Sequence, residues 1–233
     1  MSHPIAQGAL DTTLKGGRSR ADAVHQQLKA DIVACRLLPG AMLAAAQLAE
    51  RFDVSRTPVH EALKALCQEG LLRVLPRVGY IVTPVTVQDI DEIFDLRLSL
   101  EVLGAGRAAE RVSDAAVESL RAQNAQAQEN LASGSMDDPS HLESLMAGNR
   151  RFHTGVAALS GNRRLARIVG GLLDEGQRVY FLYFRTGRRP PPGDAHDDVI
   201  RALAARDAGA ARDAMAAHVQ DMWEGTRVGS ELL

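Results

Sequence analysis

The chain has 233 residues, of which 45% are hydrophobic and 24% charged, and its formal net charge is −2. This length accommodates a small domain and a medium-sized one, each with its own core, while near-neutrality neither indicates nor excludes a nucleic-acid partner. No apolar run approaches the ~20 residues that span a bilayer, and residues 1–17 lack the apolar stretch of a secretory signal. We therefore expect a cytoplasmic protein with no membrane partner. Cys35 and Cys67 fall on apolar helical faces, which favours free thiols over a disulfide.

The first third of the chain predicts a compact unit of three helices and two strands. The apolar spacing places these elements over residues 21–35, over 46–52, between Ser55 and Gly70, and over 71–75 and 80–83. A Pro-Gly pair follows the first helix, a tight link joins the next two, and a turn carrying Arg77 joins the strands. This order is typical of a winged helix-turn-helix domain, which we place at residues 20–85 after a flexible tail over 1–19.

The start of the third helix holds the candidate DNA-binding residues. Ser55 is predicted as its N-cap, with a hydroxyl that accepts from backbone N–H groups two or three residues on. The apolar positions from Val59 to Cys67 define one buried face. The opposite side and the turn between the strands are expected to meet DNA through Ser55, Arg56, Thr57, His60, Lys64, Arg77 and Gly79.

From residue 86 onward the pattern is helical throughout. Six helices are predicted, over 89–111, 114–132, 141–159, 163–184, 194–206 and 208–227, with a stiff proline-containing linker at 187–193. We therefore expect a mainly α protein whose second domain, residues 86–228, is an all-α six-helix bundle. In the first of these helices the side chains expected to face inward are Ile90, Ile93, Phe94, Leu96, Leu100 and Leu103.

Charge also separates the two domains. Residues 1–85 contain ten Lys and Arg against seven Asp and Glu, whereas residues 86–233 contain seventeen against twenty-two. A weakly basic first domain joined to an acidic second domain is the charge distribution expected for a DNA-binding module linked to another kind of domain. Because the excess of positive charge is small, we expect affinity for DNA to require two copies of the first domain.

Three histidines in the second domain are candidate metal ligands. His153 follows Asn149 by four residues, so both side chains leave the same helix face, and His196 and His218 lie on the last two helices. If they converge, three imidazoles and one amide oxygen form a four-point site for a metal ion. From spacing alone, three histidines so far apart are also compatible with ordinary surface or core positions.

Residues 20–85 resemble the DNA-binding domain of the GntR family of bacterial transcription regulators. The resemblance rests on Leu38-Pro39-Gly40, Leu48-Ala49, Val54 to Val59, Glu61-Ala62-Leu63, Leu66, Glu69-Gly70-Leu71 and Gly79. In that family the cap hydroxyl and the following arginine meet DNA, which implies a base contact for Arg56. An arginine usually stands where this chain has His60, and a charged residue often stands at the position of Ala46. Arginine reads guanine with two parallel donors and histidine does not, so His60 changes the expected operator sequence.

Residues 87–227 are similar to the FCD ligand-binding domain of the FadR-type branch of the same family. The matching residues are Asp89-Ile90, Arg97 and Glu101, Asn149, Phe152-His153, Gly161-Asn162, His196, Ala202-Leu203, Asp207, Ala211, Met215 and His218. Metal-binding members place an Asp and three His at the positions of Asn149, His153, His196 and His218. The resemblance thus implies a divalent metal, zinc or nickel. Because an amide oxygen is neutral, this metal either binds less strongly here or needs an anionic effector to complete its coordination.

Arg97 allows two interpretations. It forms either a simple helical pair with Glu101 one turn later or, as the resemblance implies, a two-pronged contact with the carboxylate of a small organic acid effector. The second interpretation makes Arg97 the effector-binding residue.

The whole sequence predicts a transcription regulator, not an enzyme. A homodimer would present two winged helices to an inverted-repeat operator in double-stranded DNA, and the resemblance favours repression relieved by the effector. One alternative is a metal-dependent enzyme tethered to a DNA-binding module, although the chain contains no His-Glu-x-x-His motif. A second alternative is an architectural protein that binds DNA without sequence preference.

Overall fold

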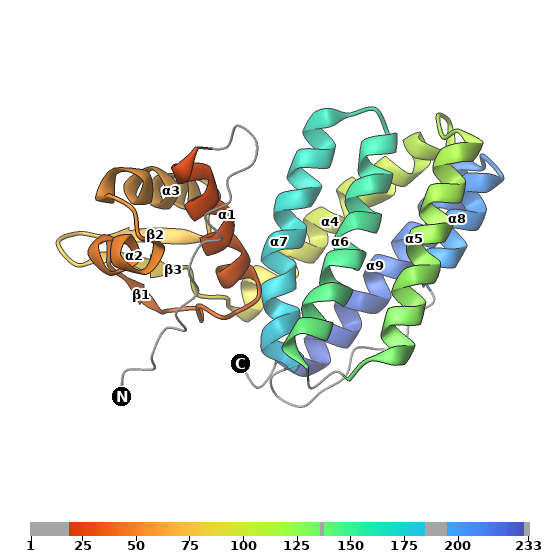
Figure 1. Cartoon of the computed structure of the whole chain (residues 1–233). Coiled ribbons are helices and arrows are strands. Elements are labelled where there is room, and N and C mark those ends of the chain that lie inside the picture. The colour runs from red at the N-terminus through yellow and green to blue at the C-terminus, as the bar shows by residue number, and fades with distance from the viewer. Residues whose placement is uncertain (1–18, 136–137, 185–194, 231–233) are drawn as a thin grey trace. The chain divides into compact units, whose positions relative to one another are not determined.

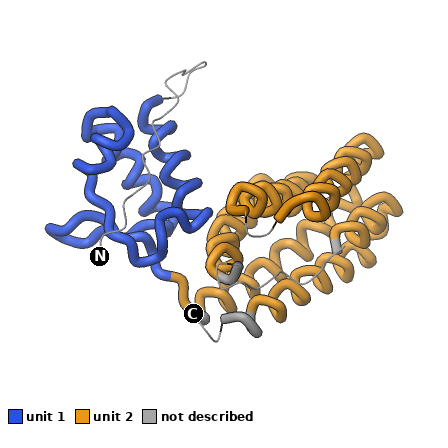
Figure 2. The backbone as a smooth tube through the Cα atoms, turned by 60° about the horizontal axis from the view of Figure 1, so that its bottom comes forward, with its two compact units in different colours: residues 1–84 blue, residues 85–233 orange. Residues whose placement is uncertain are grey.

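The computed structural model describes residues 19–135, 138–184 and 195–230, and within these ranges the chain forms helices and one small sheet (Figure 1). It divides into two compact units, residues 1–84 and 85–233 (Figure 2). Nearly all of the predicted tail at 1–19, and the whole predicted linker at 187–193, lie outside the described residues. No helix in the described ranges is long and apolar enough to cross a membrane. Cys35 and Cys67 are free thiols.

The first unit is a winged helix. Its elements are α1 Arg20–Val33, β1 Met42–Leu43, α2 Ala45–Phe52, α3 Arg56–Gln68, β2 Leu72–Leu75 and β3 Gly79–Val82. The three strands form an antiparallel sheet in the order β1-β3-β2. Strand β1 was not predicted, because two residues are too few to show an alternating pattern. It exists through its pairing with β3, in which Met42 lies opposite Ile81 and Leu43 opposite Tyr80.

The core of this unit lies between α1 and α3. Leu28 and Ile32 of α1 and Leu63 and Leu66 of α3 have no exposed surface. Burying side chains of this size contributes about 1.5–3 kcal/mol each to the free energy of unfolding. Because these residues repeat at helical spacing, the two helices pack along their apolar faces.

One buried carboxylate ties α1 to the next helix. Asp31, only 2% exposed, accepts hydrogen bonds from Gln27 Nε2 at 3.0 Å, Arg36 Nε at 2.9 Å and Arg51 Nη2 at 2.6 Å. Arg51 belongs to α2, and its guanidinium also lies 4.9 Å from the centroid of the Phe52 ring. Two arginines thus offset the desolvation of the Asp31 charge.

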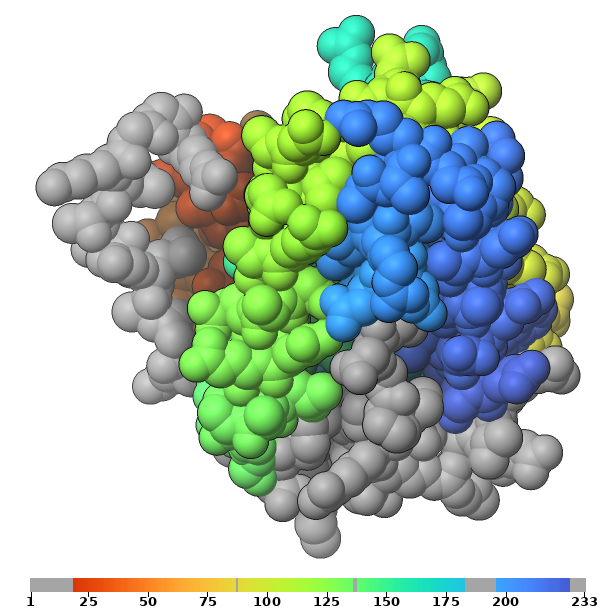
Figure 3. All heavy atoms as spheres, turned by 90° about the vertical axis from the view of Figure 1, so that its right-hand side faces the viewer, coloured from red at the N-terminus to blue at the C-terminus, as the bar shows by residue number. Residues whose placement is uncertain are grey.

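The second unit is a bundle of helices. Its described elements are α4 Val87–Ala109, α5 Asp114–Ser133, α6 Pro139–Leu159, α7 Arg163–Phe184, α8 Ala195–Ala204 and α9 Ala208–Ser230. Helix α4 packs against α6, α7 and α9, and α5 packs against α6 and α8. Figure 3 views the face on which α5, α8 and α9 lie side by side. The expected fold class, a mainly α chain with a winged helix and a helical bundle, is confirmed.

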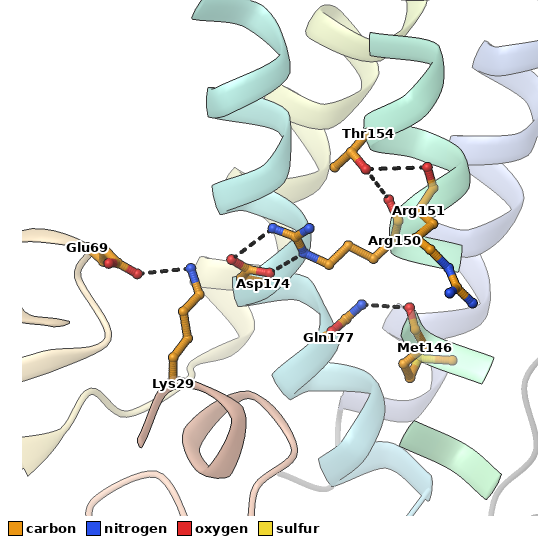
Figure 4. Close-up of polar contacts among 8 residues, drawn as sticks. All are labelled: Lys29, Glu69, Met146, Arg150, Arg151, Thr154, Asp174 and Gln177. Atoms are coloured by element: carbon orange, nitrogen blue, oxygen red, sulfur yellow. Dashed lines mark hydrogen bonds and ion pairs between the residues drawn. The ribbon is translucent and has the colours of Figure 1, made fainter. Parts of the chain in front are cut away.

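Polar side chains define where these helices begin and how two of them are joined. Thr86 and Asp89 form a reciprocal capping box at the start of α4. Between α6 and α7, Arg150 donates from Nε to Asp174 Oδ1 at 2.5 Å, and Gln177 donates to the carbonyl of Met146 at 2.8 Å (Figure 4).

Figure 4 also shows a polar contact within the first unit, in which Lys29 donates to Glu69 at 2.9 Å.

Two expectations about this unit were wrong. Leu96 and Leu103 are 51% and 40% exposed and do not face the core. The buried face of α4 contains Arg97 and Glu101 in their place. The apolar character of the two leucines therefore predicted the wrong buried positions. Residues 139–140, expected in a loop, belong to α6. Pro139 fits the first turn because no N–H is needed there, and Asp138 caps the helix by accepting from the Ser140 N–H at 2.9 Å.

Candidate nucleic-acid interface and metal centre

The first turn of α3 presents hydrogen-bonding groups that are not used within the described protein. Ser55 stands at the N-cap, but its hydroxyl makes no capping hydrogen bond, which corrects the expected cap. The physical reason is Pro58, the third helical residue, because its backbone has no N–H to donate to that hydroxyl. The Ser55 hydroxyl and the first N–H groups of α3 are therefore available to an anion at the positive end of the helix dipole.

Basic and polar side chains continue along the exposed side of the same helix. Arg56, Thr57, His60 and Lys64 are all exposed, whereas Val59 on the opposite side is fully buried. Within the described part of the chain, neither Arg56 nor Lys64 takes part in an ion pair with an acidic residue. The helix thus buries one face and leaves a row of donors on the other.

The turn between β2 and β3 carries a further exposed positive charge, that of Arg77. Arg77 is exposed and has a positive φ of 65°, and Gly79 follows with φ 140°. A Cβ atom on residue 79 would lie 2.6 Å from the backbone oxygen of Leu43. Glycine is therefore required where β3 passes β1, and it allows the turn that carries Arg77.

Inside the second unit, three helices bring three histidines together. His153 of α6, His196 of α8 and His218 of α9 offer ligand atoms that all lie within 4.8 Å of one another. Nε2 of His153 and Nε2 of His218 are 3.0 Å apart. His153 and His218 are 1% and 6% exposed, so this cluster lies inside the bundle. Asn149 stands one turn before His153 on α6 and is half-buried.

The environment keeps at least two of these rings uncharged. Burial, and secondarily the proximity of His153, lower the pKa of His196 to about 2 and the pKa of His218 to about 3. Nε2 of His196 and Nδ1 of His218 are buried and have no hydrogen-bond partner within the described residues. Neutral imidazoles with unsatisfied nitrogens in a closed site fit a divalent metal ion well.

A buried carboxylate adjoins the cluster. Arg97 donates from Nε to Glu101 Oε1 at 2.7 Å, and the other oxygen of Glu101 meets Nδ1 of His153. Burial alone would raise the pKa of Glu101, but Arg97 and His153 together hold that pKa well below its usual range. Glu101 is therefore ionised. Sequence reasoning assigned Glu101 only a pairing with Arg97, because the contact of Glu101 with His153 spans 52 residues.

Both domains of the chain match known protein families. Residues 20–82 match the family described as bacterial regulatory proteins, gntR family, and residues 92–221 match the FCD domain. The chain belongs to the GntR family of bacterial regulatory proteins.

Individual relatives extend over most of this GntR regulator. The transcriptional repressor RspR of Escherichia coli K12 is 26% identical over 221 residues, which cover 94% of this chain and 93% of RspR. The regulator YdhC of Bacillus subtilis is 30% identical over 145 residues, which cover 62% of either chain. The solved structure of E. coli McbR/YncC superposes with a TM-score of 0.72 at 24% identity, covering 88% of this chain and 95% of that one. RspR and YdhC are both described as transcriptional regulators, and with the family matches they show that the GntR chain is a DNA-binding transcriptional regulator.

A groove lies on the outer side of this GntR regulator's second unit. Its volume is about 310 Å³, and α5 and α6 line it with side chains that include Gln123, Gln126 and Arg151. Arg97 is not among its lining residues and is only 1% exposed. Its guanidinium lies 5.0 Å from the centroid of the Phe94 ring and is paired with Glu101. The predicted helical pair between Arg97 and Glu101 therefore exists, but it is fully buried.

Proposed function

We propose that this regulator is a repressor that binds an inverted-repeat operator as a homodimer and is released by a small organic acid. The acid would bind in the second unit beside a divalent metal held by His153, His196 and His218, with the Asn149 amide oxygen as a fourth ligand. The observation that carries the proposal is the pairing, in one chain, of an exposed basic helix with a closed cluster of three histidines. Such a protein would act where the chromosome is, in the cytoplasm.

The contacts with DNA follow from the exposed face of α3. The hydroxyls of Ser55 and Thr57 and the first backbone N–H groups would bind phosphates, which fixes the position of the helix. Arg56, His60 and Lys64 would then reach base edges in the major groove. At the wing, Arg77 would approach the minor groove or the backbone, with Gly79 permitting the turn.

Replacing Arg56 with alanine tests this interface. We expect the affinity for the operator to fall about 10- to 100-fold, because a good arginine contact to a base pair is worth about 1–3 kcal/mol. Fluorescence anisotropy with labelled upstream DNA at fixed salt measures the change. Arg121→Ala, on the exposed side of α5, is the matched control. Equal affinities for the two variants would refute the role of Arg56.

Exposed leucines support the dimer. Leu96 and Leu103 of α4 and Ile168 of α7 are 40–51% exposed, and α4 packs against α7. Leu100, between the two leucines, packs with Leu165 of α7. A second copy related by two-fold symmetry would cover these side chains with the same surface.

A charge on this surface would separate the two copies. We expect Leu96→Glu to elute as a monomer in size-exclusion chromatography with light scattering, because an unpaired carboxylate would be buried. Leu131→Glu alters an equally exposed leucine of α5, 46% exposed, and should leave the mass unchanged. A Leu96→Glu protein with the mass of the wild type would place the interface elsewhere.

Metal content provides the direct test of the second unit. Protein purified without chelator or a His-tag and exposed to zinc or nickel should retain about one ion per chain, and His218→Ala should retain far less. His25→Ala, which removes a histidine paired with Glu69 in the first unit, should behave like the wild type. Only trace metal in the wild-type protein after zinc and nickel addition would remove the metal from the proposal.

The charge of the site favours an anionic effector. Imidazoles and an amide oxygen bind a metal as neutral ligands, so a bound divalent ion would keep its full charge. Arg97 contacts Glu101, and Glu101 in turn contacts His153, so one side chain separates the Arg97 charge from the histidines. Because its guanidinium is paired with Glu101, we propose that Arg97 acts on the effector electrostatically and not through a two-pronged contact.

A thermal-shift screen of organic acids, with and without zinc, would identify the effector class. An acid that binds the folded state raises the melting temperature according to its affinity. We expect the increase to be larger with zinc present and to shrink in Arg97→Lys, which keeps a positive charge for Glu101 but changes its geometry. A panel of acids that never alters the melting temperature would argue against an acid effector.

A further inference from the structure

We propose that Asn124 is a positioning residue which, held by Asp197, fixes the orientation and the proton of His196. This inference rests on the proposed metal site and identifies a support for it that the three histidines themselves do not reveal. Asn124 is 6% exposed on α5, a helix that contributes none of the three imidazoles. Its partner Asp197 lies 73 residues away, in the first turn of α8 and next to His196.

The direction of each hydrogen bond follows from chemistry. An ionised carboxylate only accepts, so the amide nitrogen of Asn124 must be the group that meets Asp197 Oδ1, at 2.6 Å. The amide oxygen of Asn124 is then forced to face Nδ1 of His196, at 3.3 Å. A carbonyl oxygen also only accepts, so Nδ1 of His196 carries the proton. Nε2 of His196 therefore has a lone pair.

The position of that lone pair points to a ligand. Nε2 of His196 is buried and has no hydrogen-bond partner within the described residues. The ring is also held in its plane by Phe152, which stacks on it with centroids 3.8 Å apart and planes 20° apart. The stack with Phe152 fixes the plane, and Asn124 fixes which nitrogen is free.

Glu101 does the same for His153. Because the carboxylate of Glu101 only accepts, Nδ1 of His153 carries a proton in that contact. Nε2 of His153 faces the cluster and lies 3.0 Å from Nε2 of His218. In two of the three rings, an outer partner on a different helix thus places a proton on Nδ1 and directs Nε2 toward the cluster.

Asp197 is itself held from two sides. Gln128, one turn after Asn124 on α5, donates to its other oxygen at 3.1 Å. Gln128 shares Asp197 with Asn124 and is exposed, so Gln128→Leu removes one hydrogen bond to Asp197 while leaving the contact of Asn124 with His196 in place. Outer partners of this kind raise metal affinity by about 10- to 100-fold, because they hold the ligand in one tautomer and one orientation.

The test measures zinc affinity of the full chain by competition with a chromophoric chelator. We expect Asn124→Leu, which keeps the volume and removes both polar atoms, to bind zinc about 10- to 100-fold more weakly. Asp197→Leu should weaken zinc binding similarly, whereas Asp197→Asn, which still accepts from Asn124, should stay close to the wild type. Gln128→Leu should also stay close. If Asn124→Leu does not fold, the two Asp197 variants test the same chain of contacts.

A second measurement separates positioning from packing. Nitrogen-15 NMR of the metal-free protein should show His196 protonated at Nδ1 in the wild type and in Gln128→Leu, and a changed tautomer in Asn124→Leu. Zinc affinities equal in Asn124→Leu and Gln128→Leu, or a His196 tautomer that Asn124 does not affect, would overturn the inference. A wild-type protein that binds no zinc but shows the expected tautomers would refute the metal site and leave the orienting role of Asn124 intact.

Discussion

Three imidazoles packed together inside a helical bundle, at least two of them uncharged, are the constraint on which the second unit depends. Each ring brings two nitrogens into a region where an unpaired polar group costs about 1–3 kcal/mol. The chain meets this cost with partners from outside the cluster, Glu101 for His153 and Asn124 for His196. Because those partners lie on α4 and α5 and the rings lie on α6, α8 and α9, five of the described helices of the bundle are tied to one small volume.

This arrangement also connects the proposed effector-binding site to the DNA-binding unit along the chain. Strand β3 ends at Val82, and α4 begins at Val87 and carries both Arg97 and Glu101. A ligand that alters the contacts of Glu101 therefore acts on the helix that directly follows the wing. Its effect on DNA binding is limited to the difference in its affinity for the DNA-competent and DNA-incompetent states.

Periodicity in the sequence was sufficient to predict most helices and the exposed face of α3. It was sufficient because each of these features depends on residues within one or two turns of one another. Ser55 shows the limit of such reasoning, since the N-cap position was right but the capping bond was absent next to Pro58. In α4, the sequence assigned Leu96 and Leu103 to the core, where the structure places Arg97 and Glu101.

The outer partners of the histidines were beyond the reach of the sequence for a different reason. Asn124 and Asp197 are 73 residues apart, and Glu101 and His153 are 52 apart. A lone amide or acid in a helix normally indicates a solvated position, so only the packing of the bundle distinguishes these residues from neighbours such as Gln123. The three histidines were candidates from the sequence, but spacing alone left ordinary surface or core positions open, and the resemblance to the FCD domain was needed to favour a metal site.

The charges of the inner residues lead to one further relation between metal and acid. Arg97 and Glu101 neutralise each other, and the imidazoles of His196 and His218 are uncharged. With Asn149 in place of an acid, a divalent ion at this cluster has no anionic ligand from the described residues to offset its charge. A buried uncompensated charge is unfavourable, so an anionic ligand at the ion strengthens the binding of the ion. Linkage then requires the ion to strengthen the binding of the acid by the same factor, which makes the proposed sensor one that responds to the two together.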